Sequence, residues 1–282
     1  MIGRAYVGIS GWRFPPWRGT FYPKGLVQRR ELEYAAQQMS SIEINGSFYA
    51  LQRPQGYRKW YAETPDDFLF SVKGGRFITH MKKLRDVEVP LANFFASGVL
   101  CLGDKLGPLL WQLPPNLGFH ADRLSDFFGL LPRTTTEAAA LARNHDQRLS
   151  DRAWTVTDAE RPLRHAVEIR HDSYRDPAFL PLLREYDIAI VVADTAGKWP
   201  LLETVTSDFA YLRLHGDEEL YVSGYSGTAL DRWAGLVHGW RSGETTTDGR
   251  PRDVYVYFDN DVKVHAPYNA IDLAKRLDTL AG

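Results

Sequence analysis

The sequence predicts a single α/β barrel, in which eight parallel strands alternate with helices. Eight short apolar segments recur along the 282 residues, and each ends in polar residues or glycine. Helical patterns lie between most of them, which is typical of strand–helix–strand units. The length fits one (β/α)₈ barrel of about 250 residues as well as it fits two smaller domains. We therefore interpret residues 1–282 as a single barrel domain.

The predicted strands share an enrichment in β-branched and aromatic residues and a turn signal after each of them. In chain order they are RAYVGIS, SSIEING, FLFSVKG, GPLLWQLP, HAVEIRH, IAIVVADT, FAYLRLHG and VYVYFDND. Eight such units with right-handed crossovers close most naturally into a barrel. The alternative, an open doubly wound sheet, would carry a Gly-rich phosphate turn after its first strand, and GISGWRFPPW contains no GxGxxG.

Helical periodicity predicts the elements that connect these strands. The expected helices cover residues 31–39, 56–63, 90–101, 121–130, 136–149, 176–186, 229–241 and 269–280. The connections 74–108 and 114–163 are long enough to carry more than one element each. Residues 194–208 contain Pro200 and little periodicity, so one helix is expected to be short or missing there.

Composition excludes several classes of protein. Hydrophobic residues make up 44%, and 34 basic residues balance 35 acidic ones, which excludes disordered and collagen-like chains. The single Cys101 excludes an internal disulfide and lies in the apolar run GVLCLG, where we expect it to be buried. Without a signal-peptide pattern or a long apolar run, the chain is expected to be cytoplasmic, with no membrane partner.

Polar side chains occupy the inward phase of the predicted strands. Alternate side chains of a barrel strand face the lumen and the helices. In HAVEIRH, the apolar Val167 and Ile169 must face the helices, which turns Glu168 and Arg170 inward. The same phasing sends further polar residues inward from the other strands: Glu43, Asn45, Lys73, Gln112, Asp194, Arg213, His215 and Asp259.

This set of charges needs an explanation, because an ordinary barrel lumen is filled by branched apolar side chains. One interpretation is a self-satisfied ion network that fixes the register of the barrel. The other is a ligand pocket or active site at the carboxyl ends of the strands, where barrel enzymes keep their chemistry. We favour the second, since polar groups come from every strand, and we expect them to converge in one pocket.

Seven motifs carry a family resemblance. They are GISGWRFPPWRGTFYP, SIEINGSFYALQRP, FLFSVKGGRFITH, GPLLWQLPPN, AVEIRHDSY, YLRLHG and VYVYFDNDVKVHAPYNA. In this order they resemble the YecE-like barrels, a large bacterial and archaeal family of unknown function. The resemblance runs from about residue 8 to residue 273. It implies a TIM-type barrel with a distant fold likeness to endonuclease IV and xylose isomerase, and it implies no activity. The chain departs from the family where a glycine is usual near Lys263 or Val264.

The candidate site residues fall into groups by their chemistry. Carboxylates and imidazoles can transfer protons, so the catalytic candidates are Glu168, His215, Asp194, Glu43 and His80. Three cations from separate strands can clamp a phosphate or carboxylate: Lys73, Arg170 and Arg213. The remaining predicted substrate-binding residues are Asn45, Gln112, His171, Asp259, Asn260, Trp12, Tyr49 and Tyr225. The aromatic rings are predicted to cover the organic part of a ligand. Alternatively, they form a hydrophobic cap over the barrel.

These residues predict an enzyme, a hydrolase or isomerase that acts on a phosphorylated sugar, a nucleotide or a nucleic-acid fragment. The first alternative is a non-catalytic module that binds single-stranded or damaged nucleic acid, although the neutral net charge argues against wide backbone contact. A weaker alternative is carbohydrate binding or isomerisation without phosphate. The expected partner is a small anionic ligand, and the sequence leaves the oligomeric state open.

A metal-dependent, endonuclease-like hydrolase is the other alternative. Its ligands would come from His171, His215, Glu168, Asp194, Asp259, His80 and Glu43. The chain has no HxxxH or HxH pair, and the three inward cations would repel a divalent ion. We therefore predict no cofactor, and a bound divalent metal is the less favoured hypothesis.

Overall fold

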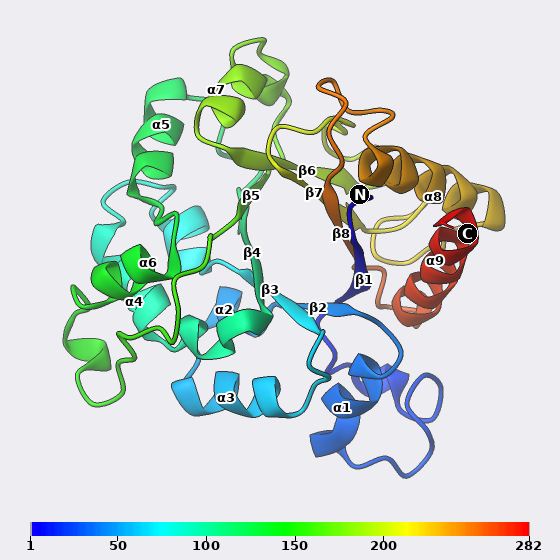
Figure 1. Cartoon of the computed structure of the whole chain (residues 1–282), viewed down its shortest axis with the longest axis horizontal. Coiled ribbons are helices and arrows are strands. Elements are labelled where there is room, and N and C mark those ends of the chain that lie inside the picture. Colours follow the sequence, from blue (N-terminus) through cyan, green and yellow to red (C-terminus); the bar gives the residue numbers. More distant parts are fainter. Residues whose placement is uncertain (1, 282) are drawn as a thin grey trace. The chain divides into compact units, whose positions relative to one another are not determined.

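Eight parallel strands form a closed barrel, in the strand order β1 to β8 (Figure 1). The structure is a computed structural model, and it describes residues 2–281. The strands are β1 (Ala5–Ser10), β2 (Ser41–Ile44), β3 (Leu69–Lys73), β4 (Leu106–Gln112), β5 (His165–Glu168), β6 (Ile188–Asp194), β7 (Phe209–Leu214) and β8 (Asp253–Phe258). Each lies within one of the eight predicted segments or extends it by one residue, so the predicted fold class is confirmed.

All eight predicted helices are present, with shifted bounds for most of them. The helices are α1 (Glu31–Ala36), α2 (Gly46–Tyr49), α3 (Pro54–Ala62), α4 (Glu88–Ala96), α5 (Ala121–Leu130), α6 (Thr135–Ala142), α7 (Phe179–Glu185), α8 (Gly227–Ser242) and α9 (His265–Ala281). The short α2 was not predicted. No helix separates β6 from β7, as the sequence indicates.

Two predicted helices end at least five residues earlier than expected. The one expected over residues 90–101 ends at Ala96, because Gly98 adopts a φ of 112°, and the chain continues as a 3-10 segment, Val99–Lys105. The one expected over residues 136–149 ends at Ala142. Cys101 lies on the 3-10 segment and is half-buried. The expectation of a buried thiol is therefore wrong.

The chain divides into two compact units. The first comprises Met1–Glu43 with Ala189–Gly282. In it, β1 pairs with β2 and β8, and β7 pairs with β6 and β8. Helix α9 packs against α8, β1 and β8 (Figure 1). Glycine is required at position 8, where a Cβ would lie 1.7 Å from the carbonyl oxygen of Ser41 on the neighbouring strand.

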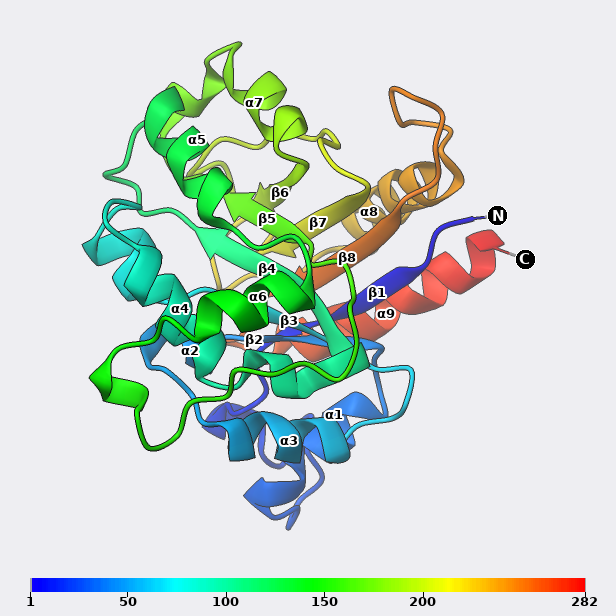
Figure 2. The ribbon, with the colours of Figure 1, turned by 60° about the vertical axis from the view of Figure 1, so that its left-hand side comes forward.

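The second unit comprises Ile44–Ile188. Strand β4 lies between β3 and β5, and α4 packs against α6 beside them (Figure 2). Its core contains the fully buried Trp111, whose ring packs against Phe94 and Phe127. No helix within residues 2–281 is long and apolar enough to span a membrane.

The last loop contains a strained residue. Val264 has a φ of 62°, a left-handed conformation that favours glycine and is strained for a β-branched residue. A glycine at this position would adopt the same turn without strain.

A capping interaction gives a first prediction. The Thr134 hydroxyl accepts a hydrogen bond from the Glu137 backbone N–H at the start of α6. Thr134→Ala is expected to lower the free energy of unfolding by about 1 kcal/mol, because that N–H loses its partner. Thr136→Ala, at an exposed position inside the same helix, is the matched control and should cost nothing. Urea unfolding measures both, and equal losses would contradict the capping role.

Candidate functional site

Arg213, from β7, is fully buried at the centre of a polar cluster in the first unit. Its guanidinium forks onto Glu43 from β2: Nε donates to Oε2 at 3.1 Å and Nη2 donates to Oε1 at 2.9 Å. Nη2 also donates to Asp259 Oδ2 at 3.0 Å, just beyond β8. Three residues that the strand phase placed inward therefore meet.

Glu43 is also fully buried, and further hydrogen bonds satisfy its carboxylate. Tyr211 OH donates to Oε2 at 2.6 Å, the Ser10 hydroxyl donates to Oε1, and Arg213 Nη2 donates to Ser10 Oγ at 2.9 Å. We did not single out Ser10 and Tyr211 from the sequence. The phase could have found Tyr211, because it precedes Arg213 by two residues on the same strand. In this unit, the ion-network interpretation fits Glu43 and Arg213 well.

His215 and two aspartates extend this Arg213 cluster. His215 is fully buried, and its Nδ1 lies 3.0 Å from Asp259 Oδ2. Burial and the neighbouring negative charge of Asp259 raise the pKa of Asp261 well above its ordinary value. Asp261 therefore holds its proton more readily than an ordinary aspartate, and it lies close to the carboxylate of Asp259. Asp261 follows the end of β8 by three residues, and we did not predict it from the sequence.

Three of the predicted residues near β6 and β8 hold loops together. Tyr225 is buried, and its hydroxyl donates to Asp194 Oδ2 at 3.0 Å and accepts from the Gly216 N–H. Burial raises the pKa of Asp194. Asn260 is buried and donates to the Ser223 carbonyl at 2.9 Å. Both side chains are thus hydrogen-bonded within the protein, and their contact with a substrate stays a prediction.

The second unit holds another polar cluster at the carboxyl ends of β3, β4 and β5. Glu168 is fully buried, and its Oε1 accepts from Arg170 Nε at 2.8 Å and from Gln112 Nε2 at 3.0 Å. The phase prediction places these residues on one side of their strands, and the structure joins them. Lys73, at the end of β3, directs its ammonium over the Phe48 ring, 4.4 Å from the centroid.

His80 lies beside the same phenylalanine, on a π-helical turn, Phe77–Met81. Its ring meets Phe48 edge to face, with the centroids 5.0 Å apart, and Nδ1 lies 2.8 Å from Thr79 Oγ1. Burial lowers the pKa of His80 to about 4, and the charges of Lys73, Arg170 and Arg76 contribute, against the opposing effect of Glu168. The imidazole is therefore neutral at pH 7. We call Lys73, His80, Gln112, Glu168 and Arg170 the His80 cluster.

The π-helical turn begins a strained stretch of chain. Lys83, Leu84 and Asp86 follow it with φ values of 49°, 68° and 49°. Left-handed conformations are costly for residues other than glycine, and both they and π-helical turns occur preferentially at functional sites. The sequence carried no signal for this feature.

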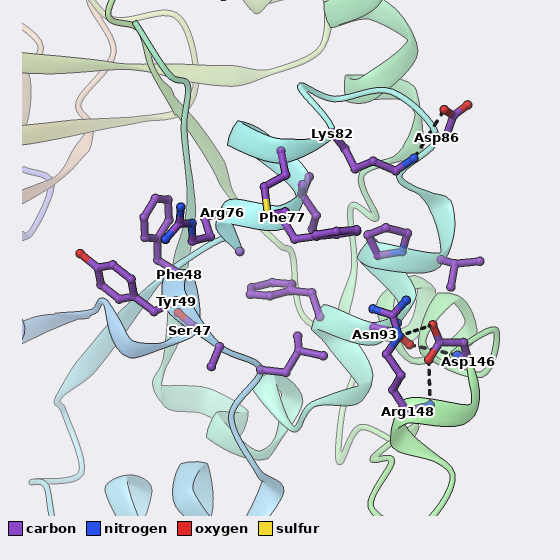
Figure 3. A pocket seen from close by; sticks show the side chains of 18 residues that line it. Ser47, Phe48, Tyr49, Arg76, Phe77, Lys82, Asp86, Asn93, Asp146 and Arg148 are labelled. Carbon is purple, nitrogen blue, oxygen red and sulfur yellow. Dashed lines mark hydrogen bonds and ion pairs between the residues drawn. The ribbon is translucent and has the colours of Figure 1, made fainter. Parts of the chain in front are cut away.

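A pocket of about 680 Å³ opens beside this turn. Figure 3 shows its lining, which includes Phe48, Tyr49, Arg76 and Phe77. We call it the Phe48 groove. Its walls come from α2, from the π-helical turn, from α4 and from residues 146–148, so only folding assembles it.

The remaining predicted residues are His171, Asn45, Trp12 and Tyr49, and their side chains differ in exposure. His171 is exposed and caps a 3-10 turn, where its Nδ1 accepts from the Ser173 N–H at 3.1 Å. Asn45 occupies the N-cap position of α2, where its side chain makes no capping hydrogen bond. Trp12 is buried. This burial fits the hydrophobic cap, and the ligand-covering role of Trp12 stays a prediction. Tyr49, by contrast, is 71% exposed.

Metal ligation was the other open question about these carboxylates. Within residues 2–281, no three histidine, cysteine, aspartate or glutamate side chains are arranged to hold a metal ion. In both clusters an arginine engages the carboxylate at its centre.

The fold and these clusters define a TIM-type barrel with buried ion pairs at the carboxyl ends of its strands. A family model described as "Protein of unknown function DUF72" matches residues 6–281. The chain belongs to this family, and the resemblance to the YecE-like barrels is confirmed.

Relatives and solved structures agree with this assignment. The chain is 30% identical over 113 residues to the UPF0759 protein YecE of Escherichia coli, and 28% identical over 118 residues to the UPF0759 protein YunF of Bacillus subtilis. These matches cover 40% and 39% of this chain and span 39% and 40% of those relatives.

The fold itself recurs over the whole chain. A DUF72 protein from Thermotoga maritima superposes with a TM-score of 0.75 at 26% identity, covering 98% of this chain and 99% of that one. A DUF72 protein from Enterococcus faecalis gives a TM-score of 0.72 at 16% identity, covering 97% and 95% of the two chains, and shows the likeness of fold alone.

Proposed function

We propose that this barrel is an enzyme, a hydrolase or isomerase, that binds a phosphorylated small molecule at the His80 cluster. The observation that carries the proposal is a half-buried imidazole and a lysine ammonium on the same Phe48 ring, with the Glu168–Arg170 pair in the same cluster. Barrel enzymes keep their catalytic groups at this end. Phosphate carries the charge that complements such a cluster, and arginine and lysine are its usual partners.

Substrate binding would itself prepare His80 for catalysis. Where Nδ1 donates to Thr79, Nε2 holds the lone pair that can accept a proton. A bound phosphate would offset the charges of Lys73, Arg170 and Arg76, and so raise the pKa of His80 towards neutrality. A base works best when its pKa is close to the working pH. His80 is therefore assigned the proton transfer, and Lys73 and Arg170 are assigned the phosphate.

The test is isothermal titration with inorganic phosphate and a nucleoside monophosphate. Lys73→Met is expected to weaken phosphate binding about tenfold or more, because a hydrogen bond to a charged group contributes about 1.5–3 kcal/mol. Lys24→Met, an exposed lysine in the first unit, is the matched control and should bind like the wild type. Equal affinity in all three proteins, or no binding at all, would contradict the proposal.

The imidazole gives an independent readout in the same samples. NMR of the His80 ring should show a neutral ring down to about pH 4 without ligand. Phosphate at saturation should shift that titration to higher pH. An unchanged titration would place the anion elsewhere. Binding that weakens steeply with salt and strengthens with oligonucleotide length would instead support the nucleic-acid module.

A further inference from the structure

The Phe48 groove has the size and lining of a small-molecule site. Its volume of about 680 Å³ lies within the range of about 300–1,000 Å³ found for ligand pockets. Large apolar side chains that solvent reaches gather along it: Tyr49 (71% exposed), Met81 (64%), Val89 (44%) and Phe77 (39%). A contiguous exposed apolar surface of this kind indicates a binding site rather than ordinary protein surface.

Most charged groups of the groove are already paired. Lys82 Nζ lies 3.6 Å from Asp86, and Arg148 Nε lies 3.4 Å from Asp146. Figure 3 shows both pairs on the side of the groove away from Phe48 and Tyr49. Arg76 also lines the groove, is exposed, and has no carboxylate within ion-pair distance among residues 2–281. The groove therefore offers one uncommitted positive charge beside aromatic rings.

Polar side chains that line the groove also have hydrogen-bond partners within the protein. The Ser47 hydroxyl donates to the Lys73 carbonyl at 2.6 Å, and Asn93 Oδ1 accepts from the Asp146 N–H at 3.0 Å. A sugar ring would bury several hydroxyl groups against this surface, and each hydroxyl without a partner costs free energy. A planar aromatic body needs no such partners and can stack on Tyr49 or Phe77.

The groove adjoins the His80 cluster through two residues. Phe48 lines the groove, and the same ring contacts Lys73 and His80. Arg76 lines the groove, and its charge acts on His80. A ligand with an aromatic part and an anionic part can therefore engage both.

We propose that the Phe48 groove binds the aromatic body of the substrate, whose anionic group lies between Arg76 and the Lys73 side of Phe48. This inference rests on the proposed function, because it concerns the same ligand. It selects an aromatic phosphate, of which a nucleotide is one kind, over a sugar phosphate.

The experiment compares three probes by isothermal titration at fixed ionic strength: 1-naphthyl phosphate, glucose 6-phosphate and inorganic phosphate. 1-Naphthyl phosphate is expected to bind about tenfold or more tightly than inorganic phosphate, as one stacked aromatic system contributes that much. Glucose 6-phosphate should show no such gain. Tyr49→Ala and Phe77→Ala should reduce the gain while leaving the affinity for inorganic phosphate unchanged. Tyr268→Ala, also exposed but in the first unit, is the matched control.

Two variants of Arg76 test the role of its positive charge. Arg76→Gln should weaken the binding of 1-naphthyl phosphate about tenfold, and Arg76→Lys should restore part of the lost affinity. Arg175→Gln, an exposed arginine outside the groove, should have no effect. All substituted side chains are exposed, and thermal unfolding confirms that each variant is folded.

The outcomes separate this inference from the proposed function. If inorganic phosphate binds and depends on Lys73, but 1-naphthyl phosphate gains nothing, the aromatic inference is wrong and the proposed function stands. If 1-naphthyl phosphate keeps its gain in Tyr49→Ala and Phe77→Ala, the ring lies elsewhere and the inference is also overturned. If neither phosphate binds the wild type, both fail.

Discussion

Arg213→Met is expected to lower the free energy of unfolding by about 3–5 kcal/mol, because it leaves the buried carboxylate of Glu43 without its counter-charge. Glu43 and Arg213 are both completely buried, and the guanidinium donates to Glu43, to Asp259 and to Ser10. Desolvation makes a lone charge at this place far more costly than one at the surface. Urea unfolding at neutral pH measures the loss.

Two further variants make this prediction specific. The double variant Arg213→Met with Glu43→Leu should lose less free energy of unfolding than the two single variants added together. Removing both side chains leaves neither charge buried without its partner. Arg232→Met removes an arginine from an exposed pair with Glu203 and should cost at most about 1 kcal/mol. If Arg213→Met were as mild as Arg232→Met, the Arg213 cluster would be hydrated rather than buried.

Acidification should destabilise the protein through His165. This residue is fully buried in the second unit; its Nδ1 accepts from Trp111 Nε1 at 3.1 Å, and its Nε2 donates to the Pro132 carbonyl at 2.8 Å. The neutral ring uses both of its nitrogens in hydrogen bonds. A second proton, on Nδ1, would point at the indole N–H of Trp111. Burial lowers the pKa of His165 from 6.5 to about 3.

The direction of the effect follows from linkage. The unfolded chain binds a proton at His165 as the pH falls below 6.5, and the folded protein does so only near pH 3. Stability from this residue is therefore complete above pH 6.5 and is lost as the pH falls towards 3. At about pH 4.5 the loss amounts to about 2–3 kcal/mol, at about 1.4 kcal/mol for each pH unit.

His165→Gln tests this assignment, because glutamine keeps one acceptor and one donor but does not titrate. Urea unfolding at several pH values between 4.5 and 7.5 should show a shallower pH dependence for the variant than for the wild type. His80 contributes to the pH dependence in the same way, because its pKa is lowered to about 4 in the folded protein, but it is present in both proteins, so the difference reports His165. Identical slopes would show that another group causes the acid sensitivity.

Local pattern predicted much of this protein. Eight apolar segments with turn signals determined the strands, and the period of two within them placed Glu43, Arg213 and Asp259 on one side. The same alternation placed Glu168 and Gln112 on the inward side of their strands, and the two side chains form a hydrogen bond. Helix α5 agrees with its predicted bounds, Ala121–Leu130, because its apolar period and its ends are both local features.

Exposure was harder to predict from the sequence. Trp12 and Tyr49 are both aromatic residues close behind barrel strands, yet Trp12 is 7% exposed and Tyr49 is 71% exposed. The difference depends on what packs over each ring. That is a property of distant segments, which neither strand phase nor composition reports.

The sequence by itself determined the barrel, its strand order and the inward phase of its charges, because these follow from periods of two and 3.6 residues along short segments. Only the tertiary structure decided how those charges are used. It joined Glu43, Arg213 and Asp259 into a satisfied network and surrounded His80 with cations. It also assembled the Phe48 groove from segments that lie up to about a hundred residues apart. Pairing and desolvation depend on distances between such segments, and these distances exist only once the chain has folded.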